Sequence, residues 1–187
     1  MNTFVIDASI AVKWVVEEDG TENALALRGE KLIAPELLTA ECANIFWKKV
    51  QRGELTEDEA LFAARLLQAS DIELLPTRAL LEHATRLAIV LNHPAYDCVY
   101  IALAIKHDCR FVTADGRLLR KLCEGHRRQF HGRVIALVDA VRGQSLDLMS
   151  RKSATKFLEN PLLGSTSVPQ ARVGEIVRGK RARALQS

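Results

Sequence analysis

The sequence is poor in several features that would point to particular classes of protein. It has no run of about 18 apolar residues that would indicate a membrane-spanning helix, so we expect a soluble, cytoplasmic protein without a leader segment. Cysteines occur at only four positions, Cys42, Cys98, Cys109 and Cys123, in apolar stretches and without C-x-x-C spacing. This favours buried thiols over a disulfide framework or a zinc site.

Motifs for several common enzyme mechanisms are also missing. The sequence has no Ser-His-Asp order typical of a hydrolase triad and no glycine-rich loop that would cradle a phosphate. Its histidines share no metal-ligand spacing, and we assign no role to any of the five, at positions 83, 93, 107, 126 and 131. Carboxylates are therefore the main candidates for chemistry.

The charges are distributed unevenly along the chain. The formal net charge is +3, but residues 144–187 contain eight basic and three acidic residues, which leaves 18 basic and 20 acidic residues before them. We predict a folded domain over residues 1–142 and a basic extension over residues 143–187. The extension lacks sustained periodicity and aromatic residues, so we interpret it as solvated and partly disordered. A phosphate-binding arm is the alternative.

Strand and helix patterns alternate along the first 142 residues, which predicts an α/β sandwich with a mostly parallel sheet. The two helices predicted within residues 36–69 are consecutive, so they form a helical hairpin inserted between strands. The predicted strands cover residues 3–7, 31–34, 71–75, 110–114 and 133–137, and the other predicted helices cover 9–18, 22–28, 78–91, 95–107 and 116–123.

Four acidic residues are placed where such a sheet forms its ligand crevice. Asp7 and Asp115 follow the first and fourth predicted strands, and ligands of open parallel sheets bind outside the carboxyl ends of the strands. Glu41 and Asp97 lie near the starts of helices that follow prolines. Four clustered carboxylates would repel one another and raise their pKa values, so a hard divalent cation is the natural occupant of the cluster.

Each acid also has a purely structural interpretation. Asp7 is placed to cap the following helix, Asp115-Gly116 is a strong turn dipeptide, and Asp97 is placed to interact favourably with a helix dipole. Glu41 is harder to explain in this way, because it shares a helix face with apolar residues, where an unpaired acid is costly.

Three polar residues are candidates for orienting these acids. Ser9 is a helix cap by default and a neighbour of the ligands if Asp7 binds metal. Thr113 points to the side of its strand end from which it can orient a carboxylate or a water. Asn44 lies one helical turn after Glu41 and is placed to form a hydrogen bond with it.

The order of these motifs resembles the PIN domain, and more narrowly the VapC toxins of type II toxin–antitoxin pairs. The resemblance covers residues 1 to about 142 and rests on Asp7-x-Ser9, Pro35 to Glu41 with Asn44, residues 96–104 around Asp97, and residues 112–118 around Asp115. It implies a three-layer α/β/α sandwich with a five-stranded parallel sheet of order 3-2-1-4-5. It also implies a homodimer, a Mg²⁺- or Mn²⁺-dependent ribonuclease activity, and a cognate VapB-type antitoxin whose extended segment blocks the acidic site.

The mechanism inferred from these residues is metal-assisted hydrolysis of phosphodiester bonds in RNA. The resemblance implies a structured RNA such as tRNA or rRNA as the substrate. Neighbouring basic side chains are needed to hold a polyanion close to an acidic site, and we choose Lys13 and Arg117 as the RNA contacts. The predicted metal-binding catalytic residues are Asp7, Glu41, Asp97 and Asp115, oriented by Ser9, Thr113 and Asn44.

Three alternatives remain open at this stage. A phosphatase of another α/β class also places an aspartate after its first strand, but usually with a second aspartate two residues later, where this chain has Ser9. A non-catalytic PIN fold that binds a partner or RNA would be expected to have lost acids. An RNA-binding protein that depends on the basic extension is the third alternative.

Overall fold

The computed structural model describes residues 2–123, 130 and 132–143, all of which belong to one unit of the chain, Met1–Leu146. Apart from Gly143, the predicted basic extension lies outside the described residues. The boundary that we predict after residue 142 therefore stays a prediction.

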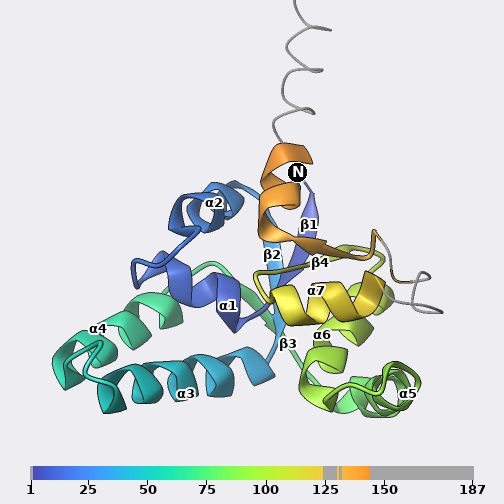
Figure 1. Ribbon diagram of the computed structural model, residues 1–187, viewed down its shortest axis with the longest axis horizontal. Coiled ribbons are helices and arrows are strands. Elements are labelled where there is room, and N and C mark those ends of the chain that lie inside the picture. The colour runs from blue at the N-terminus through green and yellow to red at the C-terminus, as the bar shows by residue number, and fades with distance from the viewer. Residues whose placement is uncertain (1, 124–129, 131, 144–187) are drawn as a thin grey trace, which may run out of the picture. The chain divides into compact units, whose positions relative to one another are not determined.

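The centre of the fold is a five-stranded parallel sheet whose order is β3-β2-β1-β4-β5, as predicted (Figure 1). The first strand lies in the middle and pairs on both sides, so that Val5 lies opposite Ile33 and Phe111. Both faces of β1 are covered, which explains its continuous apolar run. The strands are β1 Thr3–Ile6, β2 Lys31–Pro35, β3 Glu73–Leu75, β4 Arg110–Thr113 and β5 Val134–Ala136.

Helices cover both faces of the sheet (Figure 1). One layer contains α1 Ala8–Ala11, η1 Val12–Trp14, α2 Thr21–Ala26, η2 Leu27–Gly29, α3 Leu37–Gln51 and α4 Glu57–Gln68. The other contains η3 Arg78–Leu80, α5 Leu81–Leu91, α6 Ala95–Lys106 and α7 Gly116–Cys123. Residues 137–143, which follow β5, are also helical. The predicted three-layer architecture is confirmed.

The helix predicted over residues 9–18 is wrong in its length. The chain forms only α1 and one further tight turn, η1, which ends at Trp14. The apolar side chains beyond Trp14 suggested a longer helix, but tertiary contacts determine the backbone there. The Trp14 Nε1 donates a hydrogen bond to the carbonyl of Ala24 at 2.8 Å, and the Glu18 backbone N–H donates to Thr21 Oγ1 at 2.9 Å.

The predicted helical hairpin is present as α3 and α4, which pack against each other. Thr56 and Glu59 form the capping box that begins α4. On the opposite face of the sheet, α6 contacts β1, β2 and β4, and its Tyr100 ring stacks on Phe111 with 5.4 Å between the ring centroids. Helix α6 is therefore fixed against the centre of the sheet, next to the carboxyl end of β1.

Two further expectations concern thiols and membranes. Cys42, Cys98 and Cys109 are buried free thiols, as expected. In the part of the chain that the structure describes, no single helix is both long enough and apolar enough to cross a membrane. One pair of consecutive helices, Arg78–Leu91 and Ala95–Lys106, meets the criteria of length and hydropathy only when the two are taken together. The axes of these two helices are bent by 117° at the break between them.

Candidate active site

The four predicted acids line one pocket at the carboxyl edge of the sheet. The pocket has a volume of about 250 Å³, and its lining residues are Asp7, Ala8, Ser9, Glu41, Asn44, Ile45, Asp97 and Asp115. Residues from the ends of β1 and β4 thus meet residues from α3 and α6, which lie on opposite faces of the sheet. The sequence positions span more than half of the chain, and the fold brings them together.

Asp7 is buried and accepts hydrogen bonds through both carboxylate oxygens. Its Oδ1 accepts from Ser9 Oγ at 2.5 Å and from the Ile10 backbone N–H at 3.2 Å, and its Oδ2 accepts from Thr113 Oγ1 at 2.6 Å. Burial raises the pKa of Asp7 to about 6, and the two hydroxyl hydrogen bonds offset part of that effect. Asp7 therefore caps α1. Its ionised form is destabilised by burial, and a bound cation would stabilise it.

Asp115 is connected to Asp7 by a short chain of hydrogen bonds. The Asp115 backbone N–H donates to Thr113 Oγ1 at 3.0 Å, and the Ala114 N–H donates to Ser9 Oγ at 3.0 Å. The Asp115 Oδ1 accepts from the backbone N–H of Arg117 at 2.7 Å, at the start of α7. Ser9 and Thr113 thus fix Asp7 and the loop that carries Asp115 relative to each other, which agrees with the orienting role predicted for them.

Glu41 points toward the pocket from α3 and is held by a residue that we did not predict. The buried Tyr100 hydroxyl on α6 donates a hydrogen bond to Glu41 Oε2 at 2.5 Å. Burial raises the pKa of Glu41; the Tyr100 hydrogen bond opposes this, and the nearby Asp97 adds to it. The predicted Asn44 lines the pocket but forms no hydrogen bond with Glu41 in this structure.

Asp97 has an unpredicted partner as well. The His93 Nε2 lies 2.6 Å from Asp97 Oδ2, and the His93 side chain is only 12% exposed. No role is predicted for His93 from the sequence, because the histidines share no metal-ligand spacing, and the residue lies before Pro94 and outside α6. The pair nevertheless has the i, i+4 spacing of neighbours on a helix surface, which is the one local signal that could have revealed it.

The donor set of the pocket is suited to a hard divalent cation. All four acids offer oxygen, and the second oxygens of Glu41, Asp97 and Asp115 accept no hydrogen bond from the described residues. Within those residues, no three carboxylate, imidazole or thiol groups lie close enough together to bind one ion directly. Mg²⁺ usually keeps several waters and takes only one or two carboxylates, so a partly water-mediated site fits this arrangement.

The two basic residues predicted to contact RNA lie outside this pocket. Lys13 is buried, and its Nζ forms an ion pair with Glu18 at 3.0 Å. The Arg117 side chain is exposed at the start of α7, where the backbone N–H of the same residue binds Asp115. Their RNA contacts stay a prediction.

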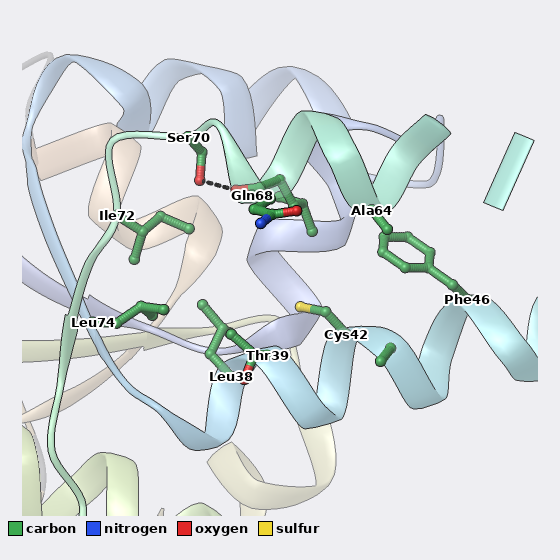
Figure 2. Close-up of a pocket in the computed structure, with 11 residues that line it drawn as sticks. Leu38, Thr39, Cys42, Phe46, Ala64, Gln68, Ser70, Ile72 and Leu74 are labelled. Atoms are coloured by element: carbon green, nitrogen blue, oxygen red, sulfur yellow. Dashed lines mark hydrogen bonds between the residues drawn. The ribbon is translucent and has the colours of Figure 1, made fainter. Parts of the chain in front are cut away.

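A second hollow, between α3, α4 and the segment that leads into β3, differs in chemical character (Figure 2). It has a volume of about 400 Å³ and is lined mainly by apolar side chains, among them Leu38, Phe46 and Ile72. The only thiol in its lining is Cys42, where burial raises the pKa to about 12. A neutral thiol is a poor nucleophile and a poor metal ligand, so we place the chemistry in the acidic pocket.

The chain is similar to one family of known proteins. Residues 4–124 match the family model of the PIN domain. Ribonuclease VapC3 of Pyrobaculum aerophilum is 31% identical over 121 residues, which cover 63% of this chain and 92% of that protein. The VapC ribonuclease Mb0985 of Mycobacterium bovis is 31% identical over 114 residues, covering 61% of this chain and 87% of that protein.

Solved structures share the fold at lower sequence identity. PAE2754 from Pyrobaculum aerophilum matches with a TM-score of 0.59 and 18% identity, over 78% of this chain and 90% of that chain. VapC20 of Mycobacterium tuberculosis, a toxin that cleaves the sarcin–ricin loop, matches with a TM-score of 0.50 and 14% identity, over 63% of this chain and 93% of that chain. At these identities the likenesses concern the fold alone.

Proposed function

The chain belongs to the PIN-domain family, with VapC ribonucleases among its relatives, and we propose that it is a divalent-metal-dependent endoribonuclease, the toxin of a type II toxin–antitoxin pair. One observation carries the proposal: Asp7, Glu41, Asp97 and Asp115 line a single pocket. A fold that only bound a partner would have no need to place four mutually repelling acids together.

Asp7 and Asp115 form the fixed half of the proposed site. The hydroxyls of Ser9 and Thr113 fix the plane of the Asp7 carboxylate, so its oxygens keep their direction without reorganisation. Backbone N–H groups at the start of α7 hold Asp115 Oδ1 and leave its other oxygen available.

Glu41 and Asp97 complete the site from the helices. Tyr100 and His93 each hold one oxygen of their partner acid and direct the other oxygen away from that contact. The chemistry that bound Mg²⁺ supplies in such a site is acidification of a water and neutralisation of charge on a phosphate, and Mn²⁺ is expected to substitute for it. The four acids are the residues that would hold the ion, directly or through water.

The remaining parts of the proposal concern substrate and partners. We propose that residues 1–142 form the nuclease domain and that the substrate is a structured RNA such as tRNA or rRNA. A VapB-type antitoxin is expected to inhibit the enzyme, and the active form is expected to be a homodimer. The VapC relatives support an RNA substrate and a VapB-type partner, and exposed apolar side chains on α5 and α6, including Leu81, Ile89 and Tyr96, are available for self-association.

The experiment that tests this function is cleavage of total cellular RNA by the full chain with Mg²⁺, with Mn²⁺ and with EDTA. Asp7→Asn removes one charge from the pocket, and Asp71→Asn, at an exposed aspartate before β3, is the matched control. We expect metal-dependent cleavage by the wild type and by Asp71→Asn, and none by a folded Asp7→Asn protein. Cleavage by Asp7→Asn at the wild-type rate would contradict the assignment.

A non-catalytic PIN fold that binds a partner or RNA is the alternative function. The proteins must then show no cleavage under any of these conditions and no heat of Mn²⁺ binding by calorimetry. The raised pKa values of Asp7 and Glu41 argue against this alternative, because the ionised carboxylates destabilise the metal-free fold and a bound cation would offset that cost.

A further inference from the structure

A cationic pocket adjoins the acidic one. Its volume is about 340 Å³, and it shares Ala8, Ser9, Ile45 and Asp115 with the acidic pocket. The walls that are not shared carry four basic side chains and one acid: Lys13, Lys48, Lys49, Arg52 and Glu18. An anion that fills the acidic pocket with a metal would therefore extend directly into a region of positive charge.

Two of the four cations are held in place by the acid. The Glu18 carboxylate bridges Lys13 at 3.0 Å and Lys49 at 2.6 Å, and Lys49 also contacts Glu54 at 3.0 Å. The side chains of Lys13 and Lys49 are only 11% and 14% exposed. They form the inner wall of the cationic pocket, and Glu18 already neutralises part of their charge.

The other two cations are placed to bind a mobile anion. Lys48 is exposed in the last turn of α3 and forms no ion pair with any described residue. Arg52 follows one turn later and is 67% exposed. Its only ion pair with another described residue is a loose contact of 3.7 Å with Glu54. Exposed charges of this kind give little to stability and are available for a ligand.

We propose that the cationic pocket holds a backbone phosphate of the RNA that adjoins the phosphate being cut, with Lys48 and Arg52 as its contacts. The inference rests on the ribonuclease function proposed above. A polynucleotide that places one phosphodiester in the acidic pocket presents its next phosphate immediately beside it. Phosphate contacts of this kind set the register of the strand and carry no base specificity.

Lys106 provides a matched control for Lys48. Both lysines are exposed, and both lie in the last turn of a helix, but Lys106 ends α6 just before β4 begins, at the sheet edge opposite the site. The test measures fluorescence anisotropy of a labelled single-stranded oligoribonucleotide with Asp7→Asn protein in EDTA. The Asp7→Asn substitution, present in every protein tested, and EDTA together prevent cleavage. Binding measured at a series of NaCl concentrations gives the slope of log K against log salt concentration.

Lys48→Gln is expected to reduce the slope by about 0.7, the value for one phosphate contact with a single strand, and to weaken binding for every sequence alike. Lys106→Gln is expected to leave both quantities unchanged. Equal effects of the two variants, or a Lys48→Gln effect confined to certain sequences, would overturn the phosphate assignment.

Glu18→Gln is a second test, in which RNA affinity is expected to change in the direction opposite to that of Lys48→Gln. It leaves the inner wall with one more net positive charge, so RNA binding is expected to tighten and the salt slope to become steeper. Weaker or unchanged binding by a Glu18→Gln protein with a wild-type melting temperature would overturn the proposal. Because binding is measured without cleavage, these results are independent of the total-RNA assay, whose failure would instead contradict the ribonuclease function.

Discussion

The two halves of the acidic pocket are built in different ways. Asp7 and Asp115 lie at the ends of neighbouring parallel strands and are joined through Ser9 and Thr113 by short hydrogen bonds. Glu41 and Asp97 lie on helices that cover opposite faces of the sheet, and each is held by one side chain, Tyr100 or His93. Within the strand half, Asp7 is buried and held through both oxygens, whereas Asp115 is half-buried and held through one oxygen, like Glu41 and Asp97 in the helix half.

This difference indicates a division of labour. Asp7 provides a fixed reference, because moving its side chain would break hydrogen bonds with Thr113 of β4 and with the start of α1. The helix half depends on how α3 and α6 are seated on the sheet, and Tyr100 connects these helices through Glu41. We therefore expect perturbations of the strand half to have larger effects than those of the helix half.

The largest expected effect is on stability and comes from Asp7. Burial raises its pKa from an ordinary value near 3.8 to about 6, which corresponds to roughly 3 kcal/mol. The folded metal-free protein binds this proton more tightly than the unfolded chain, so the contribution is most favourable below pH 3.8 and is lost as the pH rises from 3.8 to 6.

Thermal unfolding in EDTA from pH 7.5 to pH 5 checks this prediction. The wild type should gain stability relative to Asp7→Asn as the pH falls through 6, and added Mg²⁺ should reduce the gain by stabilising the ionised carboxylate. Parallel stability curves for the two proteins would show that Asp7 titrates as an ordinary aspartate.

The next largest effect is expected from Thr113→Val. This isosteric change removes the donor to Asp7 Oδ2 and the acceptor for the Asp115 N–H, in a position with no exposed surface. The loss of an orienting partner costs about 10 to 100-fold in metal affinity or activity, and we expect the upper end of this range because two acids are affected. RNA cleavage rates compared with Thr85→Val, an exposed threonine on α5, measure the effect.

A smaller loss, of about 10-fold, is expected from Tyr100→Phe. The hydroxyl is the one contact that lowers the pKa of Glu41 against the effect of burial, so its removal should shift the acid limb of the pH–rate profile to higher pH. Tyr96→Phe is the control, because Tyr96 is the only other tyrosine in the chain and is 66% exposed. An unchanged profile for Tyr100→Phe would remove Tyr100 from the site.

The smallest effect is expected from His93→Gln, a loss below about 10-fold. The Asp97 side chain is 32% exposed, so water can replace part of the lost hydrogen bond. The concentration of Mn²⁺ that gives half-maximal cleavage should rise, whereas His107→Gln, at the exposed end of α6, should leave it unchanged. A loss as large as that of Thr113→Val would contradict the proposed difference between the two halves.

The sequence predicted the strand half of the site better than the helix half. Ser9 and Thr113 were found because their contacts with Asp7 and Asp115 depend on short sequence separations and on strand ends that meet at one edge. The Tyr100 contact with Glu41 spans 59 positions and depends on how two helices pack. His93 was missed because Pro94 separates it from the helix that carries Asp97.

The fold was predicted in its sheet order and layers, and the errors lie where tertiary contacts override local pattern. The apolar residues up to Val16 predicted a helix over 9–18, but the contact of Trp14 with Ala24 and the ion pairs of Glu18 determine the backbone there. The third strand, predicted from residue 71, begins at Glu73, because an edge strand is paired only where β2 is beside it.

The central claim is that four acids from both halves hold one divalent-cation site, and metal binding tests it most directly. Mn²⁺ is titrated by calorimetry into the wild type, the control Asp71→Asn, and the variants Asp7→Asn, Glu41→Gln, Asp97→Asn and Asp115→Asn. We predict that each of the four variants weakens Mn²⁺ binding and that Asp71→Asn matches the wild type. Asp7→Asn and Asp115→Asn, at the strand ends, should show the lowest Mn²⁺ affinities. Wild-type Mn²⁺ affinity in all four variants would contradict the claim.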